Sequence, residues 1–274
     1  MMCAQLKVTR AGFYAWQTRQ ASERDEQDAL LLQRVRDVHE RSRGFYGSPR
    51  VTGQLRLDGL CVGRRRIARL MRLAGLQGRS ARLYRQSKVA RRAFYASVPY
   101  RADTALAFAT DQVWVGDITY LKVAGQWRFL AVVMDRHSRR VLGWSLGPKR
   151  DAALTSRALR QAARNRDTSA GVLFHSDRGV EYAAFEFRTR LAKLGMLQSM
   201  NRAGKMNDNA HMESFFHSMK TEELYGKKFA HDHQLRQTLS SYIAFYNQQR
   251  LHSSLRYLPP VAFERQQALH ASVN

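Results

Sequence analysis

The chain has 274 residues, of which 44% are hydrophobic, so it can bury the cores of one large domain and a smaller one. Its net charge of +24 is far outside the range of ordinary enzymes and implies a polyanionic partner, either nucleic acid or, as the weaker alternative, an anionic membrane. Two cysteines without a CxxC pair, and the lack of an apolar leader or a run of 18 apolar residues, exclude a disulfide framework and a membrane span and predict a cytoplasmic protein.

The positive charge is concentrated in one part of the chain. Residues 1–40 are neutral, with six basic and six acidic side chains, whereas residues 41–100 hold fifteen lysines and arginines and a single acid, Asp58. More than half of the excess charge therefore falls between residues 41 and 100, and an evenly solvated basic surface would not cluster in this way.

Three helices are predicted in the N-terminal part of the chain. Residues 22–43 have apolar side chains on one helical face. Ser48 is the predicted N-cap of a short second helix, with Pro49 in its first turn. A third helix is expected from Arg64 to Ala74. The outer face of this third helix carries Arg64, Arg65, Arg66, Arg69 and Arg72.

Two short helices joined by a tight turn, the second rich in arginine, are typical of a helix-turn-helix. We place this DNA-binding region at residues 44–78, after an N-terminal helical segment of residues 1–43. The alternative is a helical hairpin with a solvated basic face. Residues 79–108 mix basic and aromatic side chains and are predicted to be a linker that follows phosphates, with a disordered spacer as the alternative. The candidate DNA contacts are Arg64, Arg65, Arg66 and Arg69.

From residue 109 the pattern changes to that of an α/β domain. Strands are predicted in VWVGDITYLKV, WRFLAVVMD and RRVLGWSLG, followed by a helix and the buried strand GVLFHSD. A helix from Tyr182 to Leu194, the strand GMLQSM and another helix come next. This order predicts a meander followed by parallel crossovers, in a mixed five-stranded sheet with flanking helices over residues 109–226. Residues 227–274 are predicted to form a helical extension.

Three carboxylates of this domain stand out by position. Asp117 lies inside the first strand, where aspartate is disfavoured and where burial without a partner is costly. Asp177 ends a buried strand, and ligand sites in open α/β sheets gather at strand ends. Glu213 lies on a helix after a polar loop, with Asn209 as the predicted N-cap. Hard oxygen ligands without a Cys/His cluster favour Mg²⁺ or Mn²⁺, and three of them on a nucleic-acid binder suggest two-metal phosphoryl transfer.

Each of these residues has a simpler explanation that its local sequence leaves open. Asp177 is compatible with a turn former, and Glu213 with a surface charge. Asp117 is the hardest of the three to explain in this way. Asp135, at the end of the second strand, is a rival carboxylate that we interpret as a strand-end residue.

Taken together, the segments VWVGDITYL, FHSDRGVEY and NDNAHMESFFHSMKTE resemble the catalytic motifs of DDE transposases. The match is best to the second-reading-frame transposase of the insertion-sequence-three family, which is akin to retroviral integrases. That family separates its second aspartate from its glutamate by 35 residues, and 35 residues lie here between Asp177 and Glu213. It also has a basic residue seven positions after the glutamate, where this chain has Lys220. With the similar segments GFYGSPRV and FYNQQRLHSSLRYLPPVAFE, the resemblance covers nearly the whole chain.

The resemblance implies a ribonuclease H-like integrase catalytic core that holds two Mg²⁺ or Mn²⁺ ions through Asp117, Asp177 and Glu213, with Lys220 on transposon-end DNA. It implies cleavage at insertion-sequence ends and strand transfer into target DNA. The partners that it implies are terminal inverted repeats, target DNA, further copies of the chain and an upstream-frame helix-turn-helix protein, at a bacterial nucleoid. The alternatives are a regulatory or inactive terminal-repeat binder, which the intact triad disfavours, and a generic ribonuclease H-like nuclease, which the helix-turn-helix disfavours.

Three departures from the family pattern fall beside the triad. Gly116 stands where threonine is frequent, Val180-Glu181 stand where Ser-Gln is common, and His211-Met212 stand where small residues are usual. None of these departures removes a candidate ligand.

Overall fold

The fold comes from a computed structural model of the chain. It describes residues 9–17, 22–79, 100, 107–164, 166–168, 171–201 and 209–273. The chain divides into two compact units, Met1–Gly78 and Arg79–Asn274, which are described separately. Most of the linker predicted at residues 79–108 lies outside the described residues.

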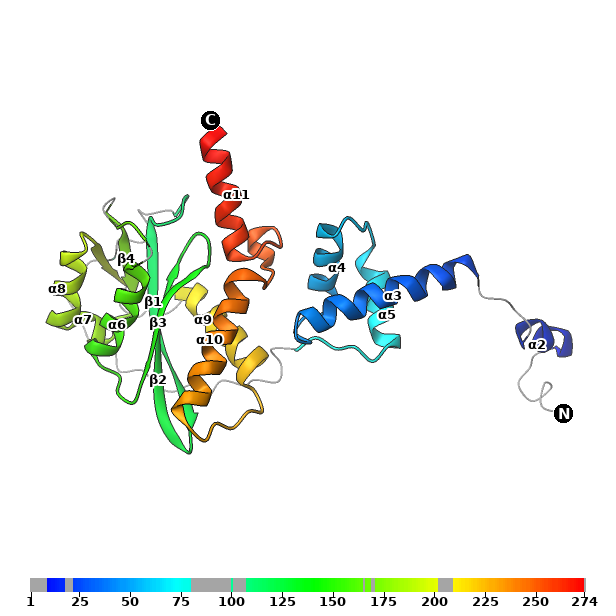
Figure 1. Cartoon of the computed structure of the whole chain (residues 1–274), viewed down its shortest axis with the longest axis horizontal. Coiled ribbons are helices and arrows are strands. Elements are labelled where there is room, and N and C mark those ends of the chain that lie inside the picture. Colours follow the sequence, from blue (N-terminus) through cyan, green and yellow to red (C-terminus); the bar gives the residue numbers. More distant parts are fainter. Residues whose placement is uncertain are drawn as a thin grey trace. The chain divides into compact units, whose positions relative to one another are not determined.

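The N-terminal unit is helical (Figure 1). Its described helices are α2 (Arg10–Gln17), α3 (Glu23–Arg41), α4 (Ser48–Leu57) and α5 (Arg64–Leu73). α3 contacts both α4 and α5, and the buried apolar side chains of the three helices form the core of the unit. These core residues are Leu31, Val35, Val38, Val51, Leu55, Ile67, Leu70 and Met71.

The ends of these helices follow capping rules. α3 begins with a capping box, in which the Ser22 side chain accepts from the backbone of Asp25 and the Asp25 side chain accepts from the backbone of Ser22. The prediction for α4 was wrong by one residue, because its N-cap is Gly47 and Ser48 is already helical. Proline is tolerated at the second helical position because the first N–H groups of a helix have no partner within it.

The C-terminal unit is built on a five-stranded sheet with the order β3-β2-β1-β4-β5. The strands are β1 (Val113–Val123), β2 (Gln126–Asp135), β3 (Val141–Gly147), β4 (Leu173–Ser176) and β5 (Leu197–Met200). β1, β2 and β3 pair antiparallel, whereas β1 pairs with β4, and β4 with β5, in parallel. This mixed, ribonuclease H-like arrangement confirms the predicted meander with parallel crossovers.

Helices flank the sheet on both faces. In sequence order they are α6 (Ala152–Ala163), α7 (Val180–Ala183), α8 (Phe185–Lys193), α9 (Ala210–Met219), the π-helix η3 (Lys220–Leu224), α10 (Asp232–Gln248), the 3-10 turn η4 (Ser253–Leu255) and α11 (Pro260–Val273). α6, α7 and α8 lie on one side of the sheet, and α9 and α10 on the other (Figure 1). The single helix predicted from Tyr182 to Leu194 is in fact two helices, because Ala184 adopts an extended backbone between α7 and α8.

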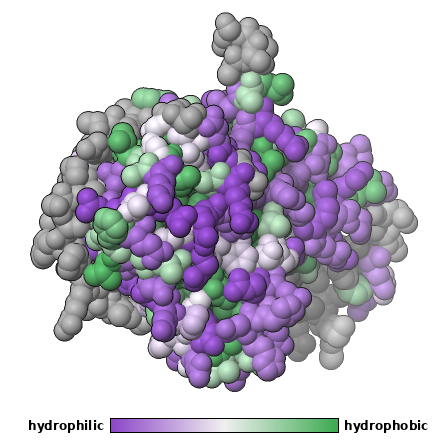
Figure 2. All heavy atoms as spheres, turned by 60° about the vertical axis from the view of Figure 1, so that its left-hand side comes forward, coloured by the Kyte–Doolittle hydropathy of each residue, from purple (hydrophilic) through white to green (hydrophobic). Residues whose placement is uncertain are grey.

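One hydrophobic core of this unit lies between the sheet and α6–α8. Trp114 and Ile118 of β1 belong to it, together with Phe174 of β4 and Tyr182 of α7. Because successive side chains of a strand point to opposite faces, Asp117 points away from this core, toward the side of α9. Hydrophilic side chains predominate on the face shown in Figure 2, where hydrophobic ones form only small, separate groups.

A buried ion pair ties the π-helix to the end of α10. Arg250 Nη2 donates to Glu222 Oε1 at 2.7 Å, and Arg250 Nε donates to Glu222 Oε2 at 2.8 Å. The Tyr242 hydroxyl also donates to Glu222 Oε2, at 2.8 Å. Both charged side chains are buried, and their pairing and hydrogen bonds offset the free-energy cost of removing the charges from water. In the described part of the chain, no helix has the length and apolar character that crossing a bilayer requires.

Candidate active site and DNA interface

Asp117 and Asp177 occupy neighbouring positions on two paired parallel strands. Gly116 of β1 lies opposite Ser176 of β4, so the next residue along each strand is the aspartate. Adjacent strands run roughly 4.8 Å apart, so Asp117 and Asp177, the first residue after β4, are neighbours along the backbone. Asp117 is buried and Asp177 is half-buried. The register of one strand pair therefore brings together two of the three predicted metal ligands.

Backbone N–H groups hold both carboxylates in place. Asp117 Oδ1 accepts from the backbone of Ile118 at 2.7 Å, and Asp177 Oδ1 accepts from the backbone of Gly179 at 3.1 Å. Burial raises the pKa of the Tyr182 hydroxyl well above its usual value, and the negative charges of Asp117, Asp177 and Glu181 raise it further. Both aspartates therefore act electrostatically on one buried phenol at the start of α7.

Aromatic rings fill the space beside Gly116, where a larger residue would place its side chain. A Cβ atom at this position would stand 2.5 Å from Cζ of Phe174 and 3.4 Å from Cε1 of Tyr182. The first distance is shorter than real Cβ atoms show, so a threonine requires the Phe174 ring to move. In this chain the packing around position 116 therefore favours glycine over a residue with a Cβ atom.

Glu213 lies on the exposed surface of α9. Asn209 is at the N-cap of this helix as predicted, but its side chain makes no capping bond and instead donates to the Gly116 carbonyl at 3.2 Å. The described residues contain no group of three His, Cys, Asp or Glu side chains arranged to hold a metal ion. The register of β1 and β4 makes Asp117 and Asp177 neighbours, and the place of Glu213 in the same site stays a prediction.

Lys220 is buried at the junction of α9 and the π-helix. Its Nζ lies 5.0 Å from the centre of the Tyr120 ring, a cation–π arrangement. The ammonium group is therefore turned toward the protein, and its contact with DNA stays a prediction. The π-helix could not be predicted from its five residues, because they fit an α-helix equally well.

The rival carboxylate Asp135 has the predicted strand-end role. It is fully buried and accepts from the backbone N–H groups of Asp111, His137 and Ser138, at 2.7, 2.9 and 2.7 Å. Burial raises the pKa of Asp135 above its usual value, although these hydrogen bonds oppose the rise. The bonds from His137 and Ser138 shape the turn between β2 and β3, and the bond from Asp111 fixes the segment just before β1, so these contacts explain the presence of the acid without a catalytic role.

An ion pair beside Asp177 could not be predicted from the sequence. Glu181, on α7, accepts from Nε and Nη2 of Arg150 at 2.8 and 2.6 Å. Arg150 lies between β3 and α6, and 31 positions separate it from Glu181. The only signal in the sequence was the presence of an acid where the family commonly has glutamine.

The arginines of α5 divide into two groups. Arg66 Nε binds Asp28 Oδ1 of α3 at 2.6 Å, and Arg69 pairs with the other oxygen of the same carboxylate. Arg64 and Arg65 are exposed and make no ion pair within the described residues. Of the four α5 arginines predicted to contact DNA, Arg66 and Arg69 are therefore ion-paired within the unit, although Arg69 is also exposed, whereas Arg64 and Arg65 are exposed without such a partner among the described residues.

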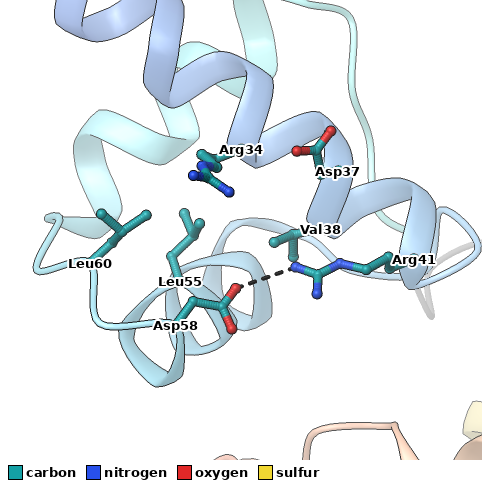
Figure 3. A pocket seen from close by; sticks show the side chains of 7 residues that line it. All are labelled: Arg34, Asp37, Val38, Arg41, Leu55, Asp58 and Leu60. Carbon is teal, nitrogen blue, oxygen red and sulfur yellow. Dashed lines mark hydrogen bonds and ion pairs between the residues drawn. The ribbon is translucent and has the colours of Figure 1, made fainter.

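A pocket of about 520 Å³ lies between α3 and the end of α4 (Figure 3). It is lined by Arg34, Asp37, Val38, Arg41, Leu55, Asp58 and Leu60. Arg41 and Asp58 form an ion pair of 3.3 Å across it. Because two acids balance its two arginines, the pocket attracts phosphate less than the exposed arginines of α5 do.

Comparison with protein families and known proteins covers both units. An HTH-like domain family matches residues 25–84, and two integrase core domain families match residues 109–206 and 194–260. Among solved structures, the HTLV-2 integrase catalytic core domain in complex with magnesium is 17% identical, with a TM-score of 0.42 over 53% of this chain and 90% of that one. The Mos1 transposase catalytic domain with raltegravir and Mg is 20% identical, with a TM-score of 0.40 over 49% of this chain and 71% of that one.

Curated relatives match almost the full length. Transposase InsF for insertion sequence IS3A of Escherichia coli K12 is 35% identical over 271 residues, which cover 96% of this chain and 92% of InsF. An uncharacterized 31 kDa protein of insertion element IS600 from Shigella sonnei is 34% identical over 263 residues, which cover 96% of this chain and 97% of that protein. The chain therefore belongs to the IS3 family of insertion-sequence transposases, as the motifs and their spacing predicted.

Proposed function

We propose that this transposase cuts DNA at the ends of its insertion sequence and joins the freed 3′-hydroxyl to target DNA, at a site formed by Asp117, Asp177 and Glu213. The observation that supports the proposal is the parallel register of β1 and β4, in which the residues that precede Asp117 and Asp177 are paired. Two adjacent carboxylates in a strongly basic chain need a cation nearby, and phosphoryl transfer uses such a cation.

The donor set fits a hard divalent cation. Mg²⁺ is commonly held by one or two carboxylates together with waters and substrate phosphates. Asp117 and Asp177 supply such a pair, and in this proposal Glu213 completes a two-ion site when α9 and the DNA strand come together. When bound, the ions neutralise charge on the phosphate and help to deprotonate the attacking water or hydroxyl.

The residues of the chain hold the reacting groups in place. In the first step a water oxygen bonds to the phosphorus at the insertion-sequence end, and the 3′-oxygen leaves as a hydroxyl. In the second step that hydroxyl attacks a target phosphate, and another 3′-oxygen leaves. Asp117 is fixed through Ile118 and Asp177 through Gly179, so both carboxylates keep their place through both steps.

In this proposal DNA is recognised by the N-terminal unit. Arg64 and Arg65, which are exposed, contact phosphates of the terminal repeat, and Asp28 orients Arg66 and Arg69 toward the same strand. Lys220 reaches transposon-end DNA only if its side chain leaves the Tyr120 ring. We also propose that further copies of the chain, and an upstream-frame helix-turn-helix protein, assemble with it on DNA.

The test is a nicking and strand-transfer assay on duplexes that carry the terminal repeat, in Mg²⁺ and in Mn²⁺. Asp177→Asn should bind the duplex as the wild type does and should not nick it. Glu186→Gln, on the exposed surface of α8, is a matched control and should nick normally. Nicking by Asp177→Asn at the wild-type rate would show that the site is misassigned. A wild-type chain that binds but never nicks would support the regulatory alternative.

A further inference from the structure

The carboxylate of Glu181 is buried beside the candidate active site. Its side chain is 0% exposed, and its Oε1 accepts both hydrogen bonds from Arg150. Its Oε2 is buried and has no hydrogen-bond partner among the described residues. A buried carboxylate is costly unless a cation compensates it, so the position of Glu181 depends on Arg150.

Glu181 and Asp177 approach each other across Gly179. A Cβ atom at residue 179 would stand 2.4 Å from Glu181 Oε1 and 3.0 Å from Asp177 Oδ1, so both oxygens border the same small space. The guanidinium that pairs with Glu181 is thereby brought to the edge of the Asp177 carboxylate. Burial alone would lower the pKa of Arg150, but the hydrogen bonds and charge of Glu181, followed by the charge of Asp177, raise it above its usual value.

Only part of the Arg150 guanidinium takes part in the ion pair with Glu181. Its side chain is 39% exposed, whereas that of Glu181 is fully buried. Nε and Nη2 donate to Glu181, and Nη1 has no hydrogen-bond partner within the described residues. The guanidinium therefore presents an N–H group to solvent close enough to Asp177 for the charge of that carboxylate to act on it.

We propose that Arg150 binds a phosphate of the DNA strand at the active site, and that Glu181 is the positioning residue that holds Arg150 there. This inference rests on the proposed function, because the phosphate belongs to the strand on which Asp117 and Asp177 act. Arginine suits the role because its planar fork can bind one carboxylate with two N–H groups and offer the others to a phosphate. The role of the acid at position 181 is then to hold that arginine through their ion pair.

The test combines protein variants with modified DNA. In Arg150→Met/Glu181→Met, apolar side chains of similar length replace both partners, so the fold should be kept, as a thermal melt can check. Single-turnover nicking is measured on terminal-repeat duplexes in which one phosphate at a time, around the cleavage position, is replaced by an uncharged methylphosphonate. The double variant should nick unmodified DNA more slowly than the wild type by a factor of about 10 to 100, the range for a lost charged hydrogen bond.

The decisive result is non-additivity at one phosphate. At the phosphate that Arg150 contacts, the methylphosphonate should slow the wild type but should not slow the double variant further. Other positions should slow both proteins equally. Glu181→Gln keeps an oxygen that can accept from Arg150, so its loss of rate should be smaller than that of the double variant. Equal additional losses at every phosphate tested would overturn the proposal.

Asp177→Asn separates this inference from the proposed function. If Asp177→Asn nicks unmodified DNA as the wild type does, the proposed active site is wrong and the inference fails with it. If Asp177→Asn is inactive while Arg150→Met/Glu181→Met nicks at the wild-type rate, only the role of Arg150 is wrong. DNA affinity without metal, measured by fluorescence anisotropy, shows whether the lost rate reflects binding or the chemical step.

Discussion

The side chain of Asn209, at the start of α9, donates a hydrogen bond to the carbonyl of Gly116, the residue immediately before Asp117. One amide thus connects the helix that carries Glu213 to the strand that carries Asp117. We expect Asn209→Ala to slow nicking about tenfold, equivalent to about 1.4 kcal/mol, because α9 loses this anchor. DNA binding by the N-terminal unit should be unchanged.

Ser214→Ala is the matched control for this prediction. Ser214 lies next to Glu213 on the exposed surface of α9 and makes no hydrogen bond through its side chain within the described residues. Nicking rates on the terminal-repeat duplex compare the two variants. Equal rates for Asn209→Ala and wild type would mean that the anchor does not position the helix.

The exposed arginines of α5 should account for part of the salt dependence of DNA binding. Replacing Arg64 and Arg65 with alanine should flatten the plot of log affinity against log salt by about 0.9 per lost phosphate contact. Thermal stability should not change, because neither side chain has an ion-pair partner within the described residues. Arg24→Ala/Arg36→Ala, on the exposed surface of α3, removes the same number of charges and serves as the matched control. If it has the same effect, net charge matters rather than position.

The contact of Asp28 with Arg66 and Arg69 should make the stability of the N-terminal unit depend on pH. The hydrogen bond from Arg66 lowers the pKa of Asp28 below its usual value of 3.8. Burial acts in the opposite direction, whereas the hydrogen bond from Arg69 and the positive charges of the two arginines lower the pKa further. A carboxylate whose pKa is lower in the folded state stabilises the fold above its unfolded pKa, and the effect disappears as pH falls through the folded pKa.

The variant Asp28→Asn should therefore melt at a lower temperature than the wild type at neutral pH. The difference should shrink as pH falls through and below 3.8, the usual pKa of the carboxyl group. Thermal melts of the full chain between pH 7 and pH 3 measure this difference. A gap that stays constant over the whole range would contradict an ion-pair role for Asp28.

The sequence could predict what depends on local pattern. The five strands follow from apolar runs and alternation, and Asp117 was recognisable because an acid inside a strand is anomalous. Asp177 was recognisable as the end of a buried strand. Their proximity then followed from the parallel pairing that the order of elements required. Glu213 was indicated by its place on a helix after a polar loop and, most specifically, by the 35-residue spacing; the described residues contain no group of three metal-binding side chains that would include it.

The remaining features arise from contacts between distant segments. Arg150 meets Glu181, and Arg250 meets Glu222, across 31 and 28 positions of the chain, and no local period encodes such pairs. The burial of Lys220 depends on Tyr120, which lies on another element. The division among the α5 arginines likewise required the position of Asp28 on a separate helix.

The pair Glu222–Arg250 should dominate the stability of the C-terminal extension. Arg250→Met leaves the Glu222 carboxylate buried without its counter-ion, which should cost about 3–5 kcal/mol of unfolding free energy. Glu222→Leu/Arg250→Met replaces both charges with apolar groups and should recover most of that loss, although Tyr242 loses its acceptor. Urea unfolding measures both variants. A double variant as unstable as Arg250→Met would show that the network matters as hydrogen bonds rather than as charges.

The packing of Gly116 against Phe174 should be visible in a double-mutant cycle. Gly116→Ala places a Cβ 2.5 Å from the Phe174 ring, so it should destabilise the fold by about 1–3 kcal/mol through overpacking. It should also slow nicking, because Asp117 is the next residue and shifts with the strand.

Phe174→Leu alone leaves a cavity in the core. In Gly116→Ala/Phe174→Leu the added methyl group faces that cavity, so the combined loss should be smaller than the sum of the two single losses. Unfolding free energies of the four proteins test this, and a strictly additive result would mean that glycine is present at position 116 for a reason other than the aromatic ring beside it.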